Sequence, residues 1–366
     1  MLFLFYSFMV LTIKVPVKEA NKIKNELMKD NNLSDKYKVR LENGFVFFPI
    51  NNKPKKSYNK YKLVNKKIET IKKEATSLKE ALSKVLTKKE LTRVKTAYDL
   101  IGDVAILEID EELRNKEKKI GKVLLDIRKD VETVLRKDSS HEGVFRTQKM
   151  KYLVGEKKKV AFHKENNIRL KLNVEKVYFS PRLSTERKRI VELIKNDFKE
   201  LENNTKKKTK ENILVMFSGC APYCCVIANN AKDMVNKVIG IEINPEGHKY
   251  GLENIKLNKL INIGLINGDV KKIAPKLSKL GTKFDRILMP LPKHAEDFLE
   301  DALMLSKKGT DIHFYNFLHE KEFDNAKKTI KKACIKAKKK CKILNLIKCG
   351  QQSPGVYRIC IDFKVM

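Results

Sequence analysis

The chain has 366 residues, of which 79 are lysine or arginine and 45 are aspartate or glutamate, so its formal net charge is +34. This length allows two or three domains with substantial cores. The excess of positive charge favours a polyanionic partner, above all nucleic acid, although a general bias toward lysine would explain part of it. The 7 cysteines have no paired short spacings. This argues against a disulfide framework or a zinc site and indicates reduced thiols in a cytoplasmic protein.

The first 51 residues predict a small α+β domain. The opening MLFLFYSFMV is apolar, but it is too short to span a membrane and has no basic leader. We interpret it as part of the first strand rather than as a signal anchor. Residues 10–17 alternate as a strand does, and residues 18–29 have helical spacing. The sequence YKVRLENGFVFFPI at 37–50 predicts a hairpin.

Residues 52–92 predict a lysine-rich connection between domains. A polar segment containing Pro54 comes first, and residues 63–91 carry apolar side chains at helical spacing among many lysines. We expect a connecting helix or a solvated arm in this stretch, because a charged run is usually a solvated face. Contact with RNA phosphates is the alternative.

Residues 93–175 predict a second α+β domain. The sequence YDLIGDVAILEI at 98–109 indicates a turn followed by a strand. Apolar residues spaced three and four apart predict one helix over 112–135. Further strands are expected at 144–151, 159–163 and 168–174.

The largest domain is expected at 176–366, where a helix over about 185–201 leads through a basic loop into an α/β region. Apolar runs at 213–217, 238–241 and 286–289 each end in small, acidic or proline residues. Buried parallel strands deliver their carboxyl ends to a ligand crevice in this way. The remaining elements are expected as helices at 295–306 and 322–339, a strand at 309–316, and a closing antiparallel hairpin at 342–348 and 356–363.

The residues at the strand ends predict a site for a nucleoside-containing ligand. Gly219 lies in a turn of small residues, SGCA, where backbone N–H groups can approach a ligand closely. Glu242 follows roughly twenty residues later, which is where a carboxylate binds a ribose diol. Asp269 ends a third segment. Because the G-x-G-x-x-G fingerprint is absent, the order favours an S-adenosylmethionine-dependent methyltransferase fold over a dinucleotide-binding fold.

Three segments in chain order, LIGDVAILEI, KVYFSPRLSTER and MPLPK, resemble the archaeal and eukaryotic tRNA (guanine-37-N1)-methyltransferase family. The resemblance extends over nearly the whole chain. It implies an α/β fold, with a Rossmann-like class I methyltransferase domain preceded by two small α+β domains. It also implies transfer of a methyl group from S-adenosylmethionine to N1 of the guanine 3′ of the anticodon. The expected partner is tRNA, bound at its anticodon loop and body by a cytoplasmic monomer that does not contact a membrane.

The resemblance assigns roles to four residues around the target base. Loss of the N1 proton leaves negative charge on O6, so the reaction needs a base and a stabilising cation. Glu186 matches the family's base, and Arg146 matches the arginine placed on O6. Tyr178 and Arg182 match positions that hold the target nucleotide. Outside this resemblance, Glu186 is more simply a helix-start glutamate, whereas Arg146 is equally a strand-edge arginine in a salt bridge and Tyr178 equally a core residue.

The resemblance also implies a set of cofactor contacts and no metal. Glu242 would accept hydrogen bonds from the ribose hydroxyls, Asp269 would accept one from the adenine amino group, and Arg187 would lie at the methionine end. The full set of expected contacts is Arg187, Gly219, Glu242, Ile243, Asp269, Val270 and Pro290.

Two positions depart from the family pattern. Val215 stands in the first strand where the family usually has an acid, and Pro290 stands where it has asparagine. Proline can offer only its carbonyl, which puts the efficiency or the exact target in doubt. Two alternatives therefore stay open: a wyosine-pathway aminocarboxypropyltransferase that acts on tRNA, and a non-catalytic tRNA-binding protein with a degenerate cofactor site.

Overall fold

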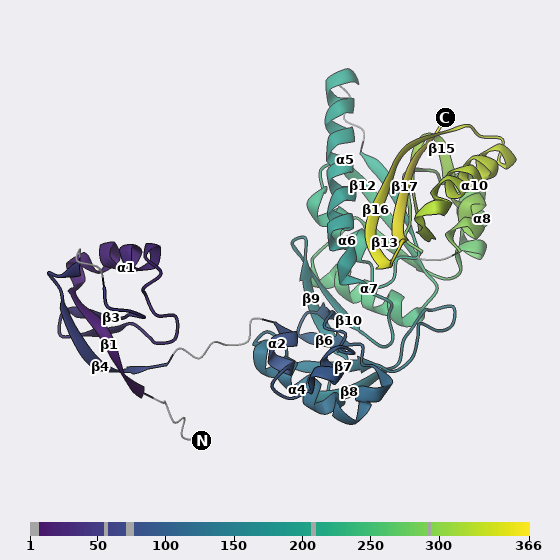
Figure 1. The fold of residues 1–366 in the computed structure, drawn as a ribbon. Coiled ribbons are helices and arrows are strands. Elements are labelled where there is room, and N and C mark those ends of the chain that lie inside the picture. Colours follow the sequence, from purple (N-terminus) through teal and green to yellow (C-terminus); the bar gives the residue numbers. More distant parts are fainter. Residues whose placement is uncertain (1–6, 55–57, 71–76, 206–209, 292–293) are drawn as a thin grey trace. The chain divides into compact units, whose positions relative to one another are not determined.

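The structure, a computed structural model, describes residues 7–54, 58–70, 77–205, 210–291 and 294–366. The chain divides into two compact units, Met1–Ala81 and Leu82–Met366 (Figure 1). The first six residues of the apolar N-terminal segment, part of the basic loop before residue 210, and residues 292–293 of the MPLPK segment lie outside the described residues. No helix of the described chain is long and apolar enough to cross a membrane.

The first unit is a four-stranded sheet with one helix on it, in the strand order β2-β3-β1-β4. Helix α1 buries Ile23 and Leu27 in a core that also contains Ile13 and Phe48. The predicted strand, helix and hairpin of this unit are confirmed. Its elements are β1 (Ser7–Pro16), α1 (Ala20–Lys29), β2 (Arg40–Glu42), β3 (Phe45–Pro49) and β4 (Lys62–Glu69).

The lysine-rich stretch is not one long helix or arm, so this prediction is wrong. Its beginning, β4, pairs with β1 as an edge strand of the first sheet. Residues 71–76 lie outside the described part, and only two short helices follow, α2 (Leu78–Leu82) and α3 (Lys88–Leu91). The exposed residues of β4 are Lys62, Leu63, Asn65 and Lys67, which suits its position at the edge of the sheet.

The second unit begins with a four-stranded sheet in the order β5-β6-β7-β8. The helix predicted over 112–135 is too long, because α4 ends at Ile127 and residues 133–137 form β7. The strand predicted at 144–151 begins later than expected, after a turn at 143–146. The elements are β5 (Tyr98–Ile101), β6 (Val104–Leu107), α4 (Glu117–Ile127), β7 (Thr133–Lys137), β8 (Met150–Gly155) and the hairpin of β9 (Val160–Glu165) and β10 (Ile168–Asn173).

A seven-stranded mixed sheet forms the rest of the second unit, in the order β13-β12-β11-β14-β15-β17-β16. The strands from β13 to β15 are parallel, and β17 runs antiparallel between β15 and β16. This is the expected Rossmann-like sheet with its closing hairpin. The strands are β11 (Glu211–Met216), β12 (Val235–Glu242), β13 (Ile263–Asn267), β14 (Phe284–Met289), β15 (Ser306–His319), β16 (Cys341–Ser353) and β17 (Val356–Val365).

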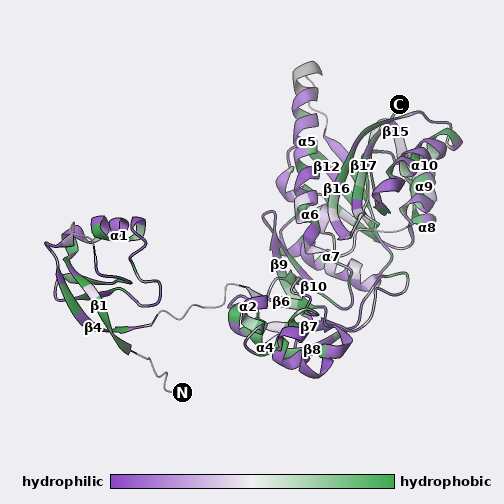
Figure 2. Ribbon diagram, in the orientation of Figure 1, coloured by the Kyte–Doolittle hydropathy of each residue, from purple (hydrophilic) through white to green (hydrophobic). Residues whose placement is uncertain are grey.

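Helices cover both faces of this sheet, and the alternation along β11 shows how the two cores are divided. Ile213 and Val215 pack with α5 and α6, whereas Leu214 and Met216 pack with α8, α9 and α10. In Figure 2 the sheet is largely green and the covering helices carry purple residues. The helices are α5 (Ser184–Thr205), α6 (Pro222–Asn230), α7 (Pro245–Leu257), α8 (Val270–Lys279), α9 (Leu299–Leu305) and α10 (Phe323–Lys336).

Candidate active site

A cavity of about 490 Å³ lies at the carboxyl ends of β11, β12 and β14. Ligands of open parallel sheets bind at this edge, where the strand order changes direction. Nine of the eleven predicted site residues line the cavity, although they come from loops far apart in the sequence. They are Arg146, Tyr178, Arg187, Gly219, Glu242, Ile243, Asp269, Val270 and Pro290.

The turn between β11 and α6 presents its backbone to the cavity. Phe217, Gly219 and Ala221 all have φ between 55° and 65°. This region is sparsely populated by side chains other than glycine, and such strain occurs where the surrounding structure holds the backbone for function. The hydroxyl of Ser218, in the same turn, is buried in the cavity wall without a hydrogen-bond partner among the described residues. The turn therefore offers a polar group that a bound ligand would satisfy.

Glu242 is fixed by two backbone hydrogen bonds. Its carboxylate oxygens accept from the N–H of Gly219 at 2.6 Å and from the N–H of Asn244 at 2.8 Å. Burial raises the pKa of Glu242, and these two hydrogen bonds oppose the rise. The remaining lone pairs of an oriented carboxylate suit a vicinal diol.

The far end of the cavity combines an acid with apolar walls. Asp269 begins α8, and one of its carboxylate oxygens accepts from the N–H of Lys271 at 2.9 Å. Val270 is buried beside it, and the rings of Phe217 and Phe298 meet edge to face with centroids 4.8 Å apart. This end of the cavity could therefore bind a flat ring with an exocyclic amino group, which would pack between apolar side chains and donate a hydrogen bond to Asp269.

Arg187 is almost fully buried, with 1% of its surface exposed. Its guanidinium forms a two-pronged ion pair with Glu165 on β9 and lies over the rings of Phe179 and Tyr223. It therefore joins α5 to the β9–β10 hairpin while one side of it faces the cavity. Because Glu165 already neutralises the charge of Arg187, we expect Arg187 to bind a ligand through hydrogen bonds rather than through an excess positive charge.

The predicted base, Glu186, is not in the wall of the cavity. Its carboxylate accepts from Nε and Nη2 of Arg189 and from the hydroxyl of Tyr315, each at 2.7 Å. The Tyr315 ring centroid lies 6.1 Å from that of Tyr223, and Tyr223 does line the cavity. Glu186 is thus one layer behind the surface that a substrate would touch.

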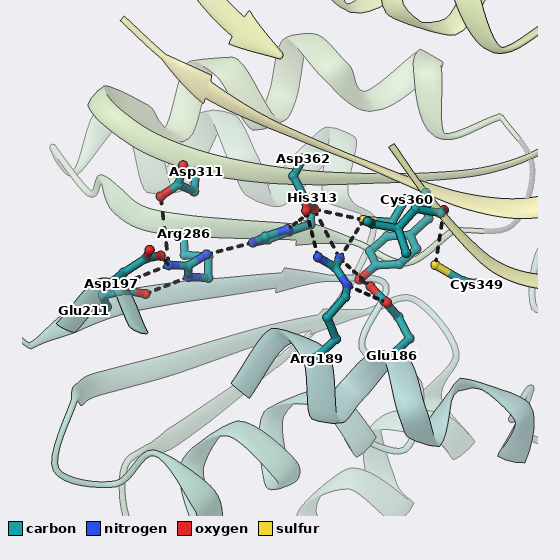
Figure 3. A network of polar contacts seen from close by, with 12 residues as sticks. Glu186, Arg189, Asp197, Glu211, Arg286, Asp311, His313, Cys349, Cys360 and Asp362 are labelled. Carbon is teal, nitrogen blue, oxygen red and sulfur yellow. Dashed lines mark hydrogen bonds and ion pairs between the residues drawn. The ribbon is translucent and has the colours of Figure 1, made fainter. Parts of the chain in front are cut away.

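Glu186 belongs to a larger buried polar network (Figure 3). Arg189 also donates to Asp362 at 2.7 Å, and Asp362 pairs with His313 at 2.6 Å. His313, Cys360 and Asp362 together have the ligand types of a metal site. The cation already present between them is Arg189, whose Nη2 lies 3.4 Å from the Cys360 sulfur. Arg189 therefore supplies a cation to two members of this group, Cys360 and Asp362.

A second cavity, of about 830 Å³, adjoins the first and shares Arg146 and Tyr178 with it. Arg182, the remaining predicted residue, lines only the second cavity and forms an ion pair with Asp99 at 2.8 Å. Sequence reasoning missed Arg358, which also lines this cavity. It lies in the closing hairpin, which was predicted only as part of the sheet.

Arg146 occupies an unusual backbone position with φ of 52°. Its carbonyl accepts a hydrogen bond from Nδ1 of His141 at 2.9 Å, and the His141 ring packs edge to face against Tyr178. Burial lowers the pKa of Arg146, and the charge of Arg358 lowers it further against an opposing effect of Tyr178. The side chain stays cationic in solution, because an arginine pKa lies far above neutrality.

The two departures from the family pattern have different structural settings. Val215 is fully buried in the core shared with α5 and α6, where an acid would lack solvent. Pro290 lines the first cavity directly. The thiols of Cys220, Cys224 and Cys225 behind the strained turn are also fully buried, and burial raises the pKa of Cys220 and of Cys224 to about 12.

Comparison with protein-family models matches three consecutive parts of the chain. Residues 12–59 match the tRNA methyltransferase 5 N-terminal domain, residues 78–158 match the TYW2 N-terminal domain, and residues 161–344 match the TRM5/TYW2 methyltransferase domain. Together these models span most of the chain.

Two archaeal relatives are similar over almost the full length. The tRNA (guanine(37)-N(1))-methyltransferase Trm5b of Pyrococcus abyssi is 34% identical, over 98% of this chain and 99% of its own. Trm5b of Methanocaldococcus jannaschii is 32% identical with the same coverage. The tRNA(Phe) (4-demethylwyosine(37)-C(7)) aminocarboxypropyltransferase of Pyrococcus horikoshii is 31% identical over 79% of this chain and 96% of its own.

Solved structures give the same grouping. The crystal structure of Pyrococcus abyssi Trm5b superposes with a TM-score of 0.78, over 98% of this chain and 99% of that one at 34% identity. The complex of aTrm5 with tRNALeu superposes with a TM-score of 0.80, over 97% of this chain and 99% of that one at 29% identity.

Proposed function

The chain belongs to the TRM5/TYW2 family of tRNA methyltransferases, and from this we propose that it transfers the methyl group of S-adenosylmethionine to N1 of guanine 37 in tRNA. The observation that carries the proposal is the first cavity. Nine residues assigned on a family resemblance meet there, at the edge of the sheet where the cofactor of such a fold binds.

The cavity's own groups match the parts of the cofactor, which supplies an electrophilic methyl group on a sulfonium. Glu242 accepts from the ribose diol, with Ile243 beside it. Asp269 accepts from the adenine amino group, and Val270 packs on the ring. The unsatisfied hydroxyl of Ser218 gives a further hydrogen bond.

Arg187, Gly219 and Pro290 complete the cofactor cradle. Arg187 lies on the α5 side, where it donates to the methionine carboxylate. Gly219 contributes a turn with no side chain between backbone and ligand. Pro290 packs against the cofactor and offers its carbonyl, which replaces part of the role of the family's asparagine.

The target guanine enters beside Tyr178, which stacks on it, while Arg146 donates to O6. Charge builds up on O6 as N1 loses its proton, so a partly buried guanidinium stabilises the transition state more than the ground state. Arg182 holds the nucleotide from the second cavity, with its orientation fixed by Asp99.

Glu186 takes the N1 proton. It must turn from its present position toward the first cavity to do so, and the network limits the cost of that movement. Arg189 keeps Asp362 as a buried anionic partner when Glu186 leaves, so no charge is stranded. Tyr315 donates a hydrogen bond to Glu186 in the resting position and so orients its carboxylate.

The two alternatives make different predictions. An aminocarboxypropyltransferase would attack another carbon of the same sulfonium, and the Pyrococcus horikoshii enzyme of that kind matches only 79% of this chain. A non-catalytic tRNA-binding protein would bind tRNA in a salt-sensitive manner without binding S-adenosylmethionine. The match of residues 12–59 to the tRNA methyltransferase 5 N-terminal domain favours the methyltransferase.

The proposed partner is tRNA, contacted at both the anticodon loop and the body. The basic composition of the chain supports such an extended polyanion. We place the enzyme in the cytoplasm as a monomer, since every residue of the proposed chemistry comes from one chain.

The decisive experiment uses labelled S-adenosylmethionine and two unmodified tRNA transcripts, one with guanine and one with adenine at position 37. Methyl label only on the guanine transcript, mapped to N1, is the expected result. A larger mass addition on the base would support the aminocarboxypropyl alternative. Absence of both transfer and cofactor binding would support the non-catalytic alternative.

A further inference from the structure

The second cavity contains two cations that the described residues leave uncompensated. Arg146 and Arg358 both line it, and neither has a carboxylate partner in the described parts of the chain. The acidic residues of the cavity are all engaged with other cations: Asp99 with Lys137 and Arg182, Glu108 with Lys95, and Asp138 with Arg136.

Arg358 is held in place by neutral contacts only. Its Nη2 donates to the hydroxyl of Tyr178 at 2.7 Å, and its Nη1 lies 3.4 Å from Oγ of Ser180. The guanidinium lies over the ring of Phe317, 4.6 Å from the centroid. A guanidinium has five N–H donors, so most of its hydrogen-bonding capacity is left for a ligand.

The half-buried guanidinium groups of Arg146 and Arg358 line the same cavity and repel each other. An anion bound between them would replace this repulsion with attraction. A phosphodiester suits the site better than a carboxylate metabolite, because the cavity adjoins the place where a nucleotide base must enter. Guanidinium forks also match the paired oxygens of phosphate.

The position of Tyr178 indicates which part of the RNA would lie in the second cavity. Tyr178 borders both cavities, so a base that stacks on it faces the cofactor cradle while its backbone lies in the second cavity. Arg146 lines both cavities and can reach the base, whereas Arg358 lines only the second. We infer that Arg358 binds a phosphodiester that flanks the target guanosine and, through Tyr178, positions the stacking ring. This inference rests on the proposed function.

The test measures tRNA binding by Arg358→Gln over a range of salt concentrations, with Lys342→Gln as control. Lys342 is an exposed lysine on β16, seven residues from Cys349 and thus about 23 Å along the strand from the cavity. The second variable is the tRNA, which carries either normal linkages or uncharged methylphosphonates at the two linkages that flank the target guanosine. Arg358→Lys keeps the charge but not the fork.

We expect Arg358→Gln to weaken binding of normal tRNA by about tenfold or more. The slope of log K against log salt should fall by about 0.7 to 0.9, the value for one phosphate contact. On the methylphosphonate tRNA the same substitution should change affinity less than about twofold, because the contact is already gone. Lys342→Gln should leave the difference between the two tRNAs unchanged, and Arg358→Lys should retain the wild-type salt slope.

Equal losses on the two tRNAs, or an unchanged slope, would overturn the inference and leave Arg358 a structural contact of Tyr178. Cofactor binding by Arg358→Gln, which should match the wild type, reports on folding. Failure of the proposed function is a separate result, since it would appear as wild-type protein that methylates neither transcript.

Discussion

In the proposed reaction Glu186 removes the N1 proton of guanine, and Arg189 fixes the resting position of its carboxylate. Glu186→Gln keeps the shape and the Tyr315 contact but cannot accept a proton, so the single-turnover rate should fall by about 10² to 10⁴. Binding of tRNA should change less than about twofold, because the side chain is buried behind the cavity. Glu192→Gln, on the exposed face of the same helix, is the control. An unaltered rate would remove Glu186 from the reaction.

Glu242 should make cofactor binding depend on pH. Burial raises its pKa, and only the ionised form accepts both ribose hydroxyls. The apparent affinity for S-adenosylmethionine should therefore be highest above that raised pKa and fall as the pH decreases through it, starting at a higher pH than an ordinary glutamate would give. Glu242→Gln should weaken binding by about ten- to a hundredfold and remove this pH dependence. Calorimetry measures both effects, and Glu253→Gln, a surface substitution on α7, is the control. If the pH dependence of binding persists in Glu242→Gln, it arises from another titratable group.

At the scale of elements, Arg286 joins three parts of the methyltransferase sheet. It contacts Glu211 at 2.8 Å, Asp197 on α5 at 2.6 Å and His313 on β15 at 2.9 Å (Figure 3). Arg286→Gln would remove the buried cation that pairs with Glu211 and Asp197, and the free energy of unfolding should fall by about 3–5 kcal/mol.

The matched control for Arg286 is Lys307→Gln, which breaks the surface pair with Asp285 and should cost less than about 1 kcal/mol. Urea denaturation of both variants gives the comparison. Similar losses in the two variants would show that the Arg286 network contributes no more than a surface ion pair.

The elements also show where sequence reasoning succeeds and where it fails. The strands of the large sheet were predicted because buried parallel strands give short apolar runs, such as ILVM at 213–216. The helix over 112–135 was overextended because Val131, Val134 and Leu135 continue the spacing of α4 by chance, although they belong to a turn and a buried strand. Strand β4 was missed because its lysines, Lys62, Lys66 and Lys67, do not alternate and its apolar residues mimic helical spacing.

The site was predictable only in part, for similar reasons. Strand-end residues such as Glu242 and Asp269 follow from the fold pattern, and the family resemblance supplied Arg146 and Tyr178. Arg358 gave no local signal, because it becomes a site residue only when β17 is inserted between β15 and β16. Glu186 lies behind the cavity wall because it binds Arg189 and Tyr315. The contact with Tyr315 forms only through tertiary packing, so the sequence alone does not predict this position.

At the scale of the whole molecule, removal of the first unit should weaken tRNA binding and leave cofactor binding intact. All residues that line both cavities lie between 99 and 358. A variant that contains only residues 82–366 should therefore bind S-adenosylmethionine within about twofold of the full chain. Its affinity for tRNA should fall by about tenfold or more, because the truncation removes the lysines of the first unit, which we propose contact phosphates. Calorimetry and filter binding test the two halves of this prediction, and a loss of cofactor binding would contradict it.

The three thiols behind the strained β11–α6 turn have a practical consequence for following motion in this enzyme. A chain without tryptophan has little intrinsic fluorescence contrast to report opening of its cofactor layer. Cys220, Cys224 and Cys225 are shielded and protonated, so an alkylating reagent can modify them only when α6 separates from the sheet. The rate of their alkylation, measured with and without S-adenosylmethionine, would time that opening, and a bound cofactor should slow it in proportion to its occupancy.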